Sequence, residues 1–215
     1  MIKNRTVQII FQTIYCTLAV IGFFNSFGYF DAKFFGNFYV YYTNLSNYIC
    51  MGFMIAVLIS TIKHTKEDGY CNTSPRFNFC CVVMIAITFL IYNVLLAKDF
   101  SVVNYFTSLN NILMHIILPI MFILNWVLFY EHKKAKWYWP LLCLIMPIIY
   151  LIFILIRAVI IGNKPGALLY PYFFLNITEL GWGRFFMWLG ILLVIFLAIS
   201  YLFVAIDHFI KNKKK

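Results

Sequence analysis

The chain has 215 residues, of which 64% are hydrophobic and 11% charged, and its mean hydropathy is +0.88. Soluble domains are nearer half apolar and a quarter charged, so this composition excludes a water-soluble globule. A bilayer-spanning helix needs about 20 mainly apolar residues, so the spans leave little chain for a large extramembrane domain. We attribute the net charge of +10 to membrane topology, which excludes a nucleic-acid partner, and we exclude a disulfide-stapled secreted fold.

Six long apolar stretches divide the chain into candidate membrane spans within one domain, residues 1–215. Each stretch is continuously apolar, whereas the strands of a membrane barrel would alternate with a period of two. We therefore expect an all-α, polytopic bundle of six transmembrane helices. The predicted spans are Val7–Phe24, Tyr39–Ile62, Phe77–Ala97, Thr107–Tyr130, Tyr138–Gly162 and Arg184–Ile206.

Basic residues fall mainly on one side of these spans. Cytoplasmic segments of membrane proteins are enriched in lysine and arginine, so both termini are expected to be cytoplasmic. The heavy use of Ile, Phe, Asn, Lys and Tyr is typical of an AT-rich bacterial genome and indicates a bacterial cell membrane. The predicted cytoplasmic side carries Lys3, Arg5, Lys63, Lys66, Arg76, Lys133, Lys134, Lys136, Lys211, Lys213, Lys214 and Lys215, and the other side carries Lys33, Lys98, Lys164 and Arg184.

Polar side chains inside the predicted spans gather in the outer half of the bundle, and Arg157 lies near the outer end of the fifth span. Because polar groups are costly to bury in lipid, their convergence at one depth predicts a site that opens outward. The inner half is expected to be poorer in polar groups. The stripes at helical spacing are Thr43, Ser46, Asn47 and Cys50 on the second span and Ser108, Asn111 and His115 on the fourth, while Thr88, Asn125 and Ser200 are scattered in the inner half.

Pro119 lies four residues after His115 in the fourth span. Proline has no N–H to donate to the carbonyl four residues earlier, which here belongs to His115. The sequence therefore predicts a kink and a free carbonyl acceptor beside the imidazole. Such exposed backbone is tolerated in a membrane only where it faces protein or a wet cavity.

His115 is the only one of the four histidines in the outer half, so neither a three-histidine zinc site nor a histidine-rich di-iron site is expected there. The chain contains no Gly-x-Ser-x-Gly elbow and no phosphate-binding glycine loop, and we expect no metal and no cofactor. The remaining option is a hydroxyl nucleophile with a histidine base. An imidazole in an apolar span is expected to be uncharged, which is the state that a general base needs.

Three segments of the chain resemble the androgen-induced protein / androgen-dependent TFPI-regulating protein family, which are six-helix membrane proteins with bacterial relatives. Family members studied as enzymes are threonine hydrolases that cleave fatty acid esters of hydroxy fatty acids with an intramembrane Thr and His, and the resemblance implies that these are Thr43 and His115. In the animal members one more residue separates the His from its proline, and the surroundings of the Thr are less polar. The segments are Tyr41-Tyr42-Thr43-Asn44, the run from Asn111 to His115 that leads to a proline, and Tyr170-Pro171-Tyr172-Phe173.

We therefore expect an integral-membrane hydrolase of lipid esters, in which Thr43 attacks the ester carbonyl and His115 takes its proton. Asn47 and Asn111 are the expected oxyanion donors. Arg157 is expected to anchor the free carboxylate of a fatty-acid-like substrate, because its planar fork suits a carboxylate. Candidate acids on the outer side are confined to loops, so a dyad is favoured over a triad; these acids are Asp31, Asp99 and Glu179.

Each of these residues also has an ordinary structural explanation. Thr43 could bond back to a carbonyl one turn earlier, and His115 could be a packing hydrogen-bonder. Asn47 and Asn111 could join helices, and Arg157 could extend to the interface. Two other functions therefore stay open: a binder or carrier of an anionic amphiphile, and a membrane scaffold. Lipids are the expected partners in every case, and the oligomeric state stays open.

Overall fold

The computed structural model describes residues 1–30, 32–97, 106, 108–162, 164 and 167–210. The described residues form helices and loops and contain no strand beyond one isolated bridge between Cys71 and Tyr130. Two of the helical segments, η2 and η4, are π-helical, and η1 and η5 are 3₁₀ turns. The elements are α1 Arg5–Ser26, η1 Phe38–Val40, α2 Tyr42–Lys63, α3 Pro75–Ile91, η2 Tyr92–Leu96, α5 Leu109–Ile112, η4 Leu113–Ile117, α6 Leu118–Phe129, α7 Trp139–Cys143, α8 Ile145–Ile161, η5 Phe173–Leu175 and α9 Ile177–Phe209.

Six helices among the described residues are long and apolar enough to cross a membrane, which confirms the predicted all-α bundle. Three of them are composite. Pro75–Leu96 joins α3 to η2, Leu109–Phe129 joins α5, η4 and α6, and Trp139–Ile161 joins α7 to α8. Most predicted boundaries differ from these by one to three residues, although the predicted start at Thr107 lies outside the described residues.

The last helix begins earlier than the predicted Arg184. The side chain of Asn176 accepts a hydrogen bond of 3.3 Å from the backbone N–H of Glu179 and caps a first helical turn at Ile177. Gly181 then adopts φ 70° and ψ 166°, which bends the helix. Only glycine adopts such angles without strain, so Gly181 interrupts α9 but does not end it.

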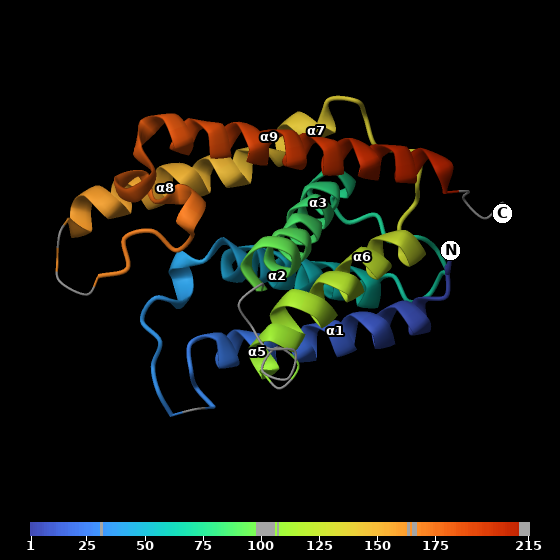
Figure 1. Ribbon diagram of the computed structural model, residues 1–215. Helices are drawn as coiled ribbons and strands as arrows, with labels where there is room; N and C mark the ends of the chain where they lie inside the picture. The colour runs from blue at the N-terminus through green and yellow to red at the C-terminus, as the bar shows by residue number, and fades with distance from the viewer. Residues whose placement is uncertain (31, 98–105, 107, 163, 165–166, 211–215) are drawn as a thin grey trace.

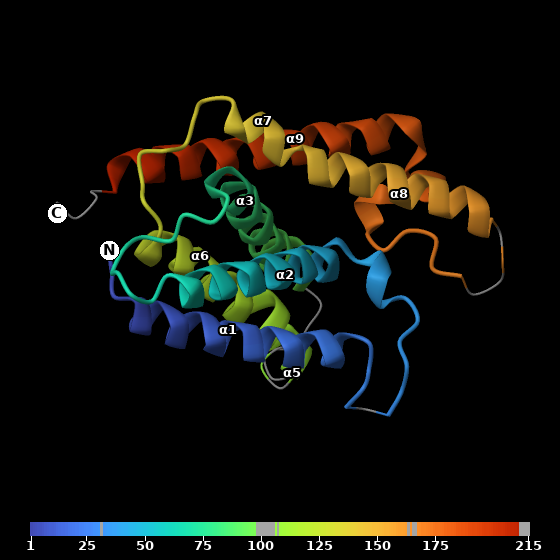
Figure 2. The ribbon, with the colours of Figure 1, turned by 180° about the vertical axis from the view of Figure 1, so that it is seen from behind.

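The helices form two layers with α3 between them (Figure 1). One layer contains α7, α8 and α9, and the other contains α1, α2 and the α5–α6 helix, as the reverse view also shows (Figure 2). α3 packs against α2, α6, α7 and α9, and it is the most buried of the membrane-length helices. The core therefore follows α3, and the cavities described below lie along it.

Polarity is distributed as membrane solvation requires. The outward surface of α8 is apolar, with Val159 83% and Ile160 75% exposed. Fully enclosed side chains include polar ones such as Gln8, Gln12 and Asn125. Exposed apolar surface this continuous is favourable against hydrocarbon and unfavourable against water, so it indicates a lipid-facing exterior.

The first and last helices share one end of the bundle. α1 begins and α9 ends there, and we call it the terminal end; the opposite end, where α1 ends and α2 begins, is the distal end (Figure 1). An even number of crossings produces this arrangement. Several basic residues that predict the sidedness of the termini lie outside the described residues: Lys98, Lys211, Lys213, Lys214 and Lys215.

Candidate active site

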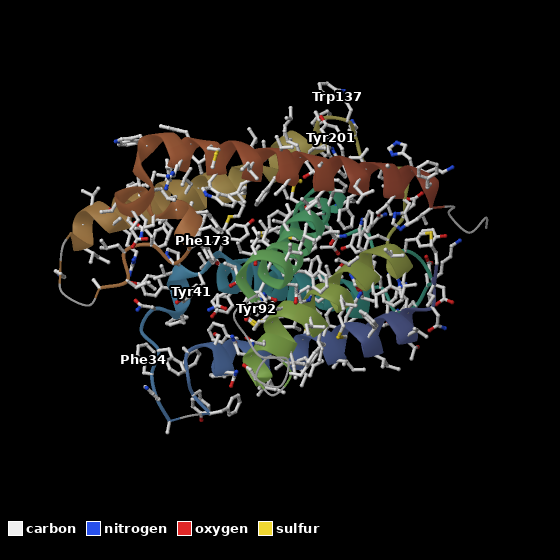
Figure 3. All side chains as sticks on the ribbon, in the orientation of Figure 1. Phe34, Tyr41, Tyr92, Trp137, Phe173 and Tyr201 are labelled. Carbon is white, nitrogen blue, oxygen red and sulfur yellow. The ribbon has the colours of Figure 1, made fainter. Side chains whose placement is uncertain are left out.

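A cavity of about 600 Å³ lies at the distal end, and we call it the polar cavity. Thr43 from α2 and His115 from η4 both line it, so the structure brings the two predicted catalytic residues to one space. Asn111 from α5 lines it as well. The loop after α1 closes one side with Phe34 and its neighbours, and Figure 3 places Phe34, Tyr41 and Tyr92 on the same side of the molecule, away from Trp137 and Tyr201.

A second, apolar cavity of about 320 Å³ adjoins the polar one. Thr43, Leu96 and Tyr172 line both cavities, so they form the boundary between them. Aliphatic and aromatic side chains of α3, α8, η5 and α9 form most of the remaining wall. A hydroxyl group thus lies where a polar space meets an apolar one.

Thr43 is the second residue of α2, preceded by two tyrosines that face different cavities. Tyr41 lines the polar cavity and Tyr42 the apolar one. The backbone N–H of Thr43 is one of the unpaired donors at the helix start, and it donates to the Tyr172 hydroxyl over 3.3 Å. The hydroxyls of Thr43 and Tyr172 also interact. Tyr172 therefore fixes the start of α2 and the position of the candidate nucleophile.

Two π-helical turns meet beside the imidazole. In η4 the N–H of Leu118 bonds to the carbonyl of Leu113, and in η2 the N–H of Ala97 bonds to that of Tyr92, both across five residues. The Tyr92 ring stacks on the His115 ring with 3.4 Å between centroids and 8° between planes. π-Helical turns in membrane-length helices often occur at functional sites, because they widen the helix and redirect side chains.

The prediction of a free carbonyl at His115 was wrong, and the predicted kink at Pro119 stays a prediction, since the helix there shows a π-helical turn. The chain widens into η4 just before Pro119, and the carbonyl of His115 accepts from the amide of Asn93 over 3.2 Å. A neighbouring side chain thus replaces the N–H that proline lacks. Asn93 joins η2 to η4 and holds the wide turn in place.

The imidazole of His115 is 3% exposed, and its Nδ1 has no hydrogen-bond partner among the described residues. Asn111, one turn earlier, accepts from the Tyr92 hydroxyl through Oδ1 over 2.7 Å. This bond orients the amide and leaves its Nδ2 group free to donate. His115 and Asn111 therefore offer a base and a donor on one wall of the polar cavity.

Asn47 and Arg157, two of the predicted binding residues, do not line the polar cavity. Asn47 donates both amide protons to backbone carbonyls, to Thr43 over 2.8 Å and to Met114 over 2.9 Å. Its donors are therefore used to join α2 to η4, which is the interhelical role and not that of an oxyanion donor. Its neighbour Ser46 likewise bonds across to Thr88 of α3 over 2.7 Å.

Arg157 donates from Nη1 to the carbonyls of Leu168 over 2.6 Å and Leu169 over 3.3 Å. It is 8% exposed and lies with its guanidinium carbon 6.0 Å from the centre of the Tyr39 ring. The guanidinium thus holds the segment that leads to Tyr172, and Arg157 lines neither the polar cavity nor the apolar one.

Tyr172, Tyr92 and Asn93 are site residues that the sequence reasoning did not assign. The order Tyr170-Pro171-Tyr172 was a signal for the first, because it supports the family resemblance. Burial raises the pKa of Tyr172 to about 12, so its hydroxyl keeps its proton at neutral pH. Of the candidate acids, Glu179 is exposed at the start of α9, and Asp31 and Asp99 lie outside the described residues.

A second polar cluster occupies the terminal end, contrary to the prediction of a polar-poor inner half. Gln12 donates to Asn125 over 3.3 Å and to the Cys71 thiol over 3.4 Å, and Gln8 donates to the carbonyl of Gly69 over 2.8 Å. Gln8 and Gln12 are one helical turn apart on α1, a spacing that could have revealed them. The cluster joins α1 to α6 and to the α2–α3 loop.

The end of α9 is held at the same end of the bundle by a buried hydrogen bond between Asp207 and His132. Asp207 accepts from His132 Nδ1 over 2.9 Å and from the backbone N–H groups of Lys134 and Ala135 over 2.9 and 2.8 Å. His132 is fully buried and Asp207 is 3% exposed. Every donor in this arrangement comes from the α6–α7 loop, so the pair fixes that loop to α9.

Comparisons with protein-family models, with curated proteins and with solved structures found no match to this chain.

Proposed function

We propose that the protein is an integral-membrane hydrolase of lipid esters, of the type that cleaves fatty acid esters of hydroxy fatty acids. The observation that carries the proposal is the position of Thr43 at the boundary of the polar and apolar cavities, with His115 on the wall of the polar one. An ester bound with its acyl chain in the apolar cavity has its carbonyl next to the Thr43 hydroxyl. The family resemblance of the segments around Thr43, His115 and Tyr172 supports the same chemistry.

In the proposed reaction Thr43 Oγ attacks the ester carbonyl while the imidazole of His115 takes the hydroxyl proton. His115 returns that proton to the departing oxygen, so the alcohol half of the ester leaves through the polar cavity, and an acyl-threonine remains with its chain in the apolar cavity. Water activated by His115 then releases the fatty acid. The unpaired Nδ1 of His115 supports this role, because hydrogen bonds within the described residues do not occupy it.

Asn111 is the oxyanion donor in this proposal, because its Oδ1 is held by Tyr92 and its Nδ2 stays free. Asn47 and Arg157 act as positioning residues. Asn47 sets the spacing between the Thr43 and His115 backbones through its bonds to Thr43 and Met114. Arg157 holds the segment before Tyr172. Loss of one oxyanion donor typically lowers turnover by about 10²–10³.

We also propose that both termini face the cytoplasm, so that the polar cavity opens toward the outer leaflet of a bacterial cell membrane. The basic residues of the described loops support this, because Lys63, Lys66 and Arg76 lie at the terminal end. The orientation is tested with lysines engineered into the distal loops and a membrane-impermeant amine reagent applied to intact cells. Labelling is expected on intact cells, and labelling that occurs only after lysis would mean that the distal end faces the cytoplasm.

Hydrolysis by the purified chain in phospholipid nanodiscs tests the function. Wild type is expected to release fatty acid from a branched fatty acid ester and to react with a fluorophosphonate probe. Thr43→Ala should lose both reactions. Thr61→Ala is the matched control, since that buried threonine hydroxyl lies at the other end of α2 and bonds to the carbonyl of Val57. Probe labelling that survives Thr43→Ala would refute the threonine nucleophile.

A binder of amphiphiles that does not hydrolyse them is the alternative function, because paired polar and apolar cavities also suit a molecule with a head group and a chain. The same nanodiscs distinguish the two. Stoichiometric retention of intact ester by wild type, with no acid released over hours and no probe labelling, favours the binder and contradicts the hydrolase.

A further inference from the structure

A third cavity, of about 660 Å³, lies nearer the terminal end, and two cysteine side chains from different helices meet on its wall. Cys80 comes from the second turn of α3, and Cys143 is the last residue of α7. Their sulfur atoms lie 3.5 Å apart. Both are free thiols in the structure. The pair belongs neither to the polar cavity nor to the apolar one.

The other four cysteines lack one or more of these features. Cys50 and Cys81 lie near each other, but both are fully enclosed, and the Cys50 thiol donates to the backbone carbonyl of Cys81 over 3.7 Å. Cys71 is buried among Gln8, Gln12 and Thr61. Cys16 is partly exposed on α1. Cys80 therefore stands out as a partly exposed thiol that touches a second sulfur and lines a cavity.

The surroundings give the two sulfurs different roles. The Cys143 thiol is within donating distance of the Cys80 sulfur, at 3.5 Å, and of the carbonyl of Trp139, at 3.4 Å, and Arg76 lines the same cavity one turn before Cys80 on α3. A donated hydrogen bond and a nearby cation both favour negative charge on the accepting sulfur. Cys80 is thus suited to attack an external disulfide, and Cys143 is placed to attack the Cys80 sulfur in the mixed disulfide that results.

We propose that Cys80 and Cys143 form a reversible dithiol–disulfide site that is oxidised by small disulfides of the glutathione class. The Cys80 thiolate attacks one sulfur of the small disulfide, whose S–S bond breaks and whose second half leaves as a thiolate that takes up a proton. The Cys143 thiol loses its proton and attacks the Cys80 sulfur, which forms the Cys80–Cys143 bond and expels the other half as a thiol. Two protein thiols are oxidised, and one small disulfide is reduced to two thiols.

The bond would connect the central helix α3 to the layer of α7, α8 and α9. Cys80 lies on the central helix α3, and Cys143 ends α7, at the start of the layer of α7, α8 and α9. α3 packs against α7 and α9 of that layer, with the Phe79 ring against the Trp139 ring. A covalent bond between two residues that lie 63 positions apart in the sequence reduces the conformational entropy of the unfolded chain, and it holds α7 against α3.

The test uses the full chain in nanodiscs, first reduced and freed of reductant, then incubated with oxidised glutathione at several ratios to the reduced form. The samples are quenched in acid, denatured and treated with maleimide, and intact mass counts the free thiols. Wild type is expected to lose two maleimide additions and to give a peptide pair joined through Cys80 and Cys143. Dithiothreitol should restore all six additions.

Single substitutions identify the order of the steps. Cys143→Ser is expected to accumulate a glutathione adduct on Cys80, since the second sulfur is missing, while Cys80→Ser forms neither the adduct nor the bond. Cys16→Ser is the matched control and should form the bond as wild type does. Six maleimide additions on oxidised wild type, or a glutathione adduct on Cys80 that persists in wild type as it does in Cys143→Ser, would overturn the proposal. Hydrolase activity does not enter any of these readouts.

Discussion

Two groups of buried polar side chains lie at opposite ends of the bundle, one around the polar cavity and one between α1, α6 and the loops of the terminal end. Both contain asparagine and histidine, and both are as buried as the apolar core. At the terminal end His132 is bonded at both ring nitrogens, to Asp207 and to the carbonyl of Val127. At the distal end His115 lines a cavity and keeps Nδ1 unpaired.

The difference separates polar groups that stabilise from polar groups that are available to a ligand. A buried imidazole with two partners contributes to folding, because its removal leaves those partners unsatisfied. A buried imidazole nitrogen without a partner costs stability, and such groups cluster at functional sites. Substitutions of His132 at the terminal end and of His115 at the distal end can therefore be compared within one protein.

The largest expected effect comes from replacing each buried histidine by alanine. His115→Ala should lower ester hydrolysis by about 10²–10⁴, the usual contribution of general-base catalysis, with little change in melting temperature. His132→Ala should do the reverse, lowering the melting temperature while each folded molecule keeps its activity. Turnover and thermal unfolding are measured on both variants in the same nanodiscs. If His115→Ala and His132→Ala lose the same activity per folded molecule, the two histidines do not have the different roles described above.

Asp207→Ala should cause the next largest effect, entirely on stability. The substitution leaves His132 and the N–H groups of Lys134 and Ala135 without their acceptor. Breaking a buried pair in this way costs about 3–5 kcal/mol. Unfolding in increasing fractions of sodium dodecyl sulfate measures the loss, and Asp207→Asn, which keeps one acceptor, should lose less. A smaller loss of stability in Asp207→Ala than in Asp207→Asn would contradict the role of Asp207 as the shared acceptor.

A smaller effect is expected at the boundary of the two cavities. Tyr172→Phe removes the acceptor of the Thr43 N–H and the hydroxyl beside the Thr43 side chain, so turnover should fall about tenfold, equivalent to one hydrogen bond. Hydrolysis rate at saturating substrate is the measurement. Tyr201→Phe on the exposed surface of α9 serves as the control and should be unchanged. An unaltered rate in Tyr172→Phe would show that the Tyr172 hydroxyl does not position Thr43 for the reaction.

The smallest effect tests the terminal cluster. Gln12→Leu should cost about 1 kcal/mol of stability, because hydrogen bonds between membrane helices are worth little individually. The same detergent titration measures it, with activity as the unaffected quantity. Combining it with Asn125→Leu should recover part of the loss, since both partners of the bond are then apolar. Further loss in the double variant would mean that Asn125 has another essential partner.

The six spans were predictable because hydrophobic length decides them, and the shared cavity of Thr43 and His115 agrees with the spacing of their polar stripes. The interhelical role of Asn47 was one of the two explanations open from the sequence, but the carbonyl partners of Asn47 and Arg157 were not predictable. Each donates to backbone carbonyls, of Met114 in the π-helical turn and of Leu168 in an irregular loop. Helical spacing shows which face a side chain occupies. It does not show where a neighbouring helix widens or which loop carbonyl comes within reach, because tertiary packing determines both.

The two π-helical turns also affect how this chain can be compared with others. Each holds one residue more than the α-helical turn it replaces, and one residue corresponds to about 100° of rotation. The faces before and after η4 therefore differ in phase, so a helical wheel drawn through the whole of Leu109–Phe129 misassigns one half of it. If a homologue lacks one residue in this segment and has an ordinary α-helical turn in place of η4, its surrounding side chains keep the same register as those of this chain.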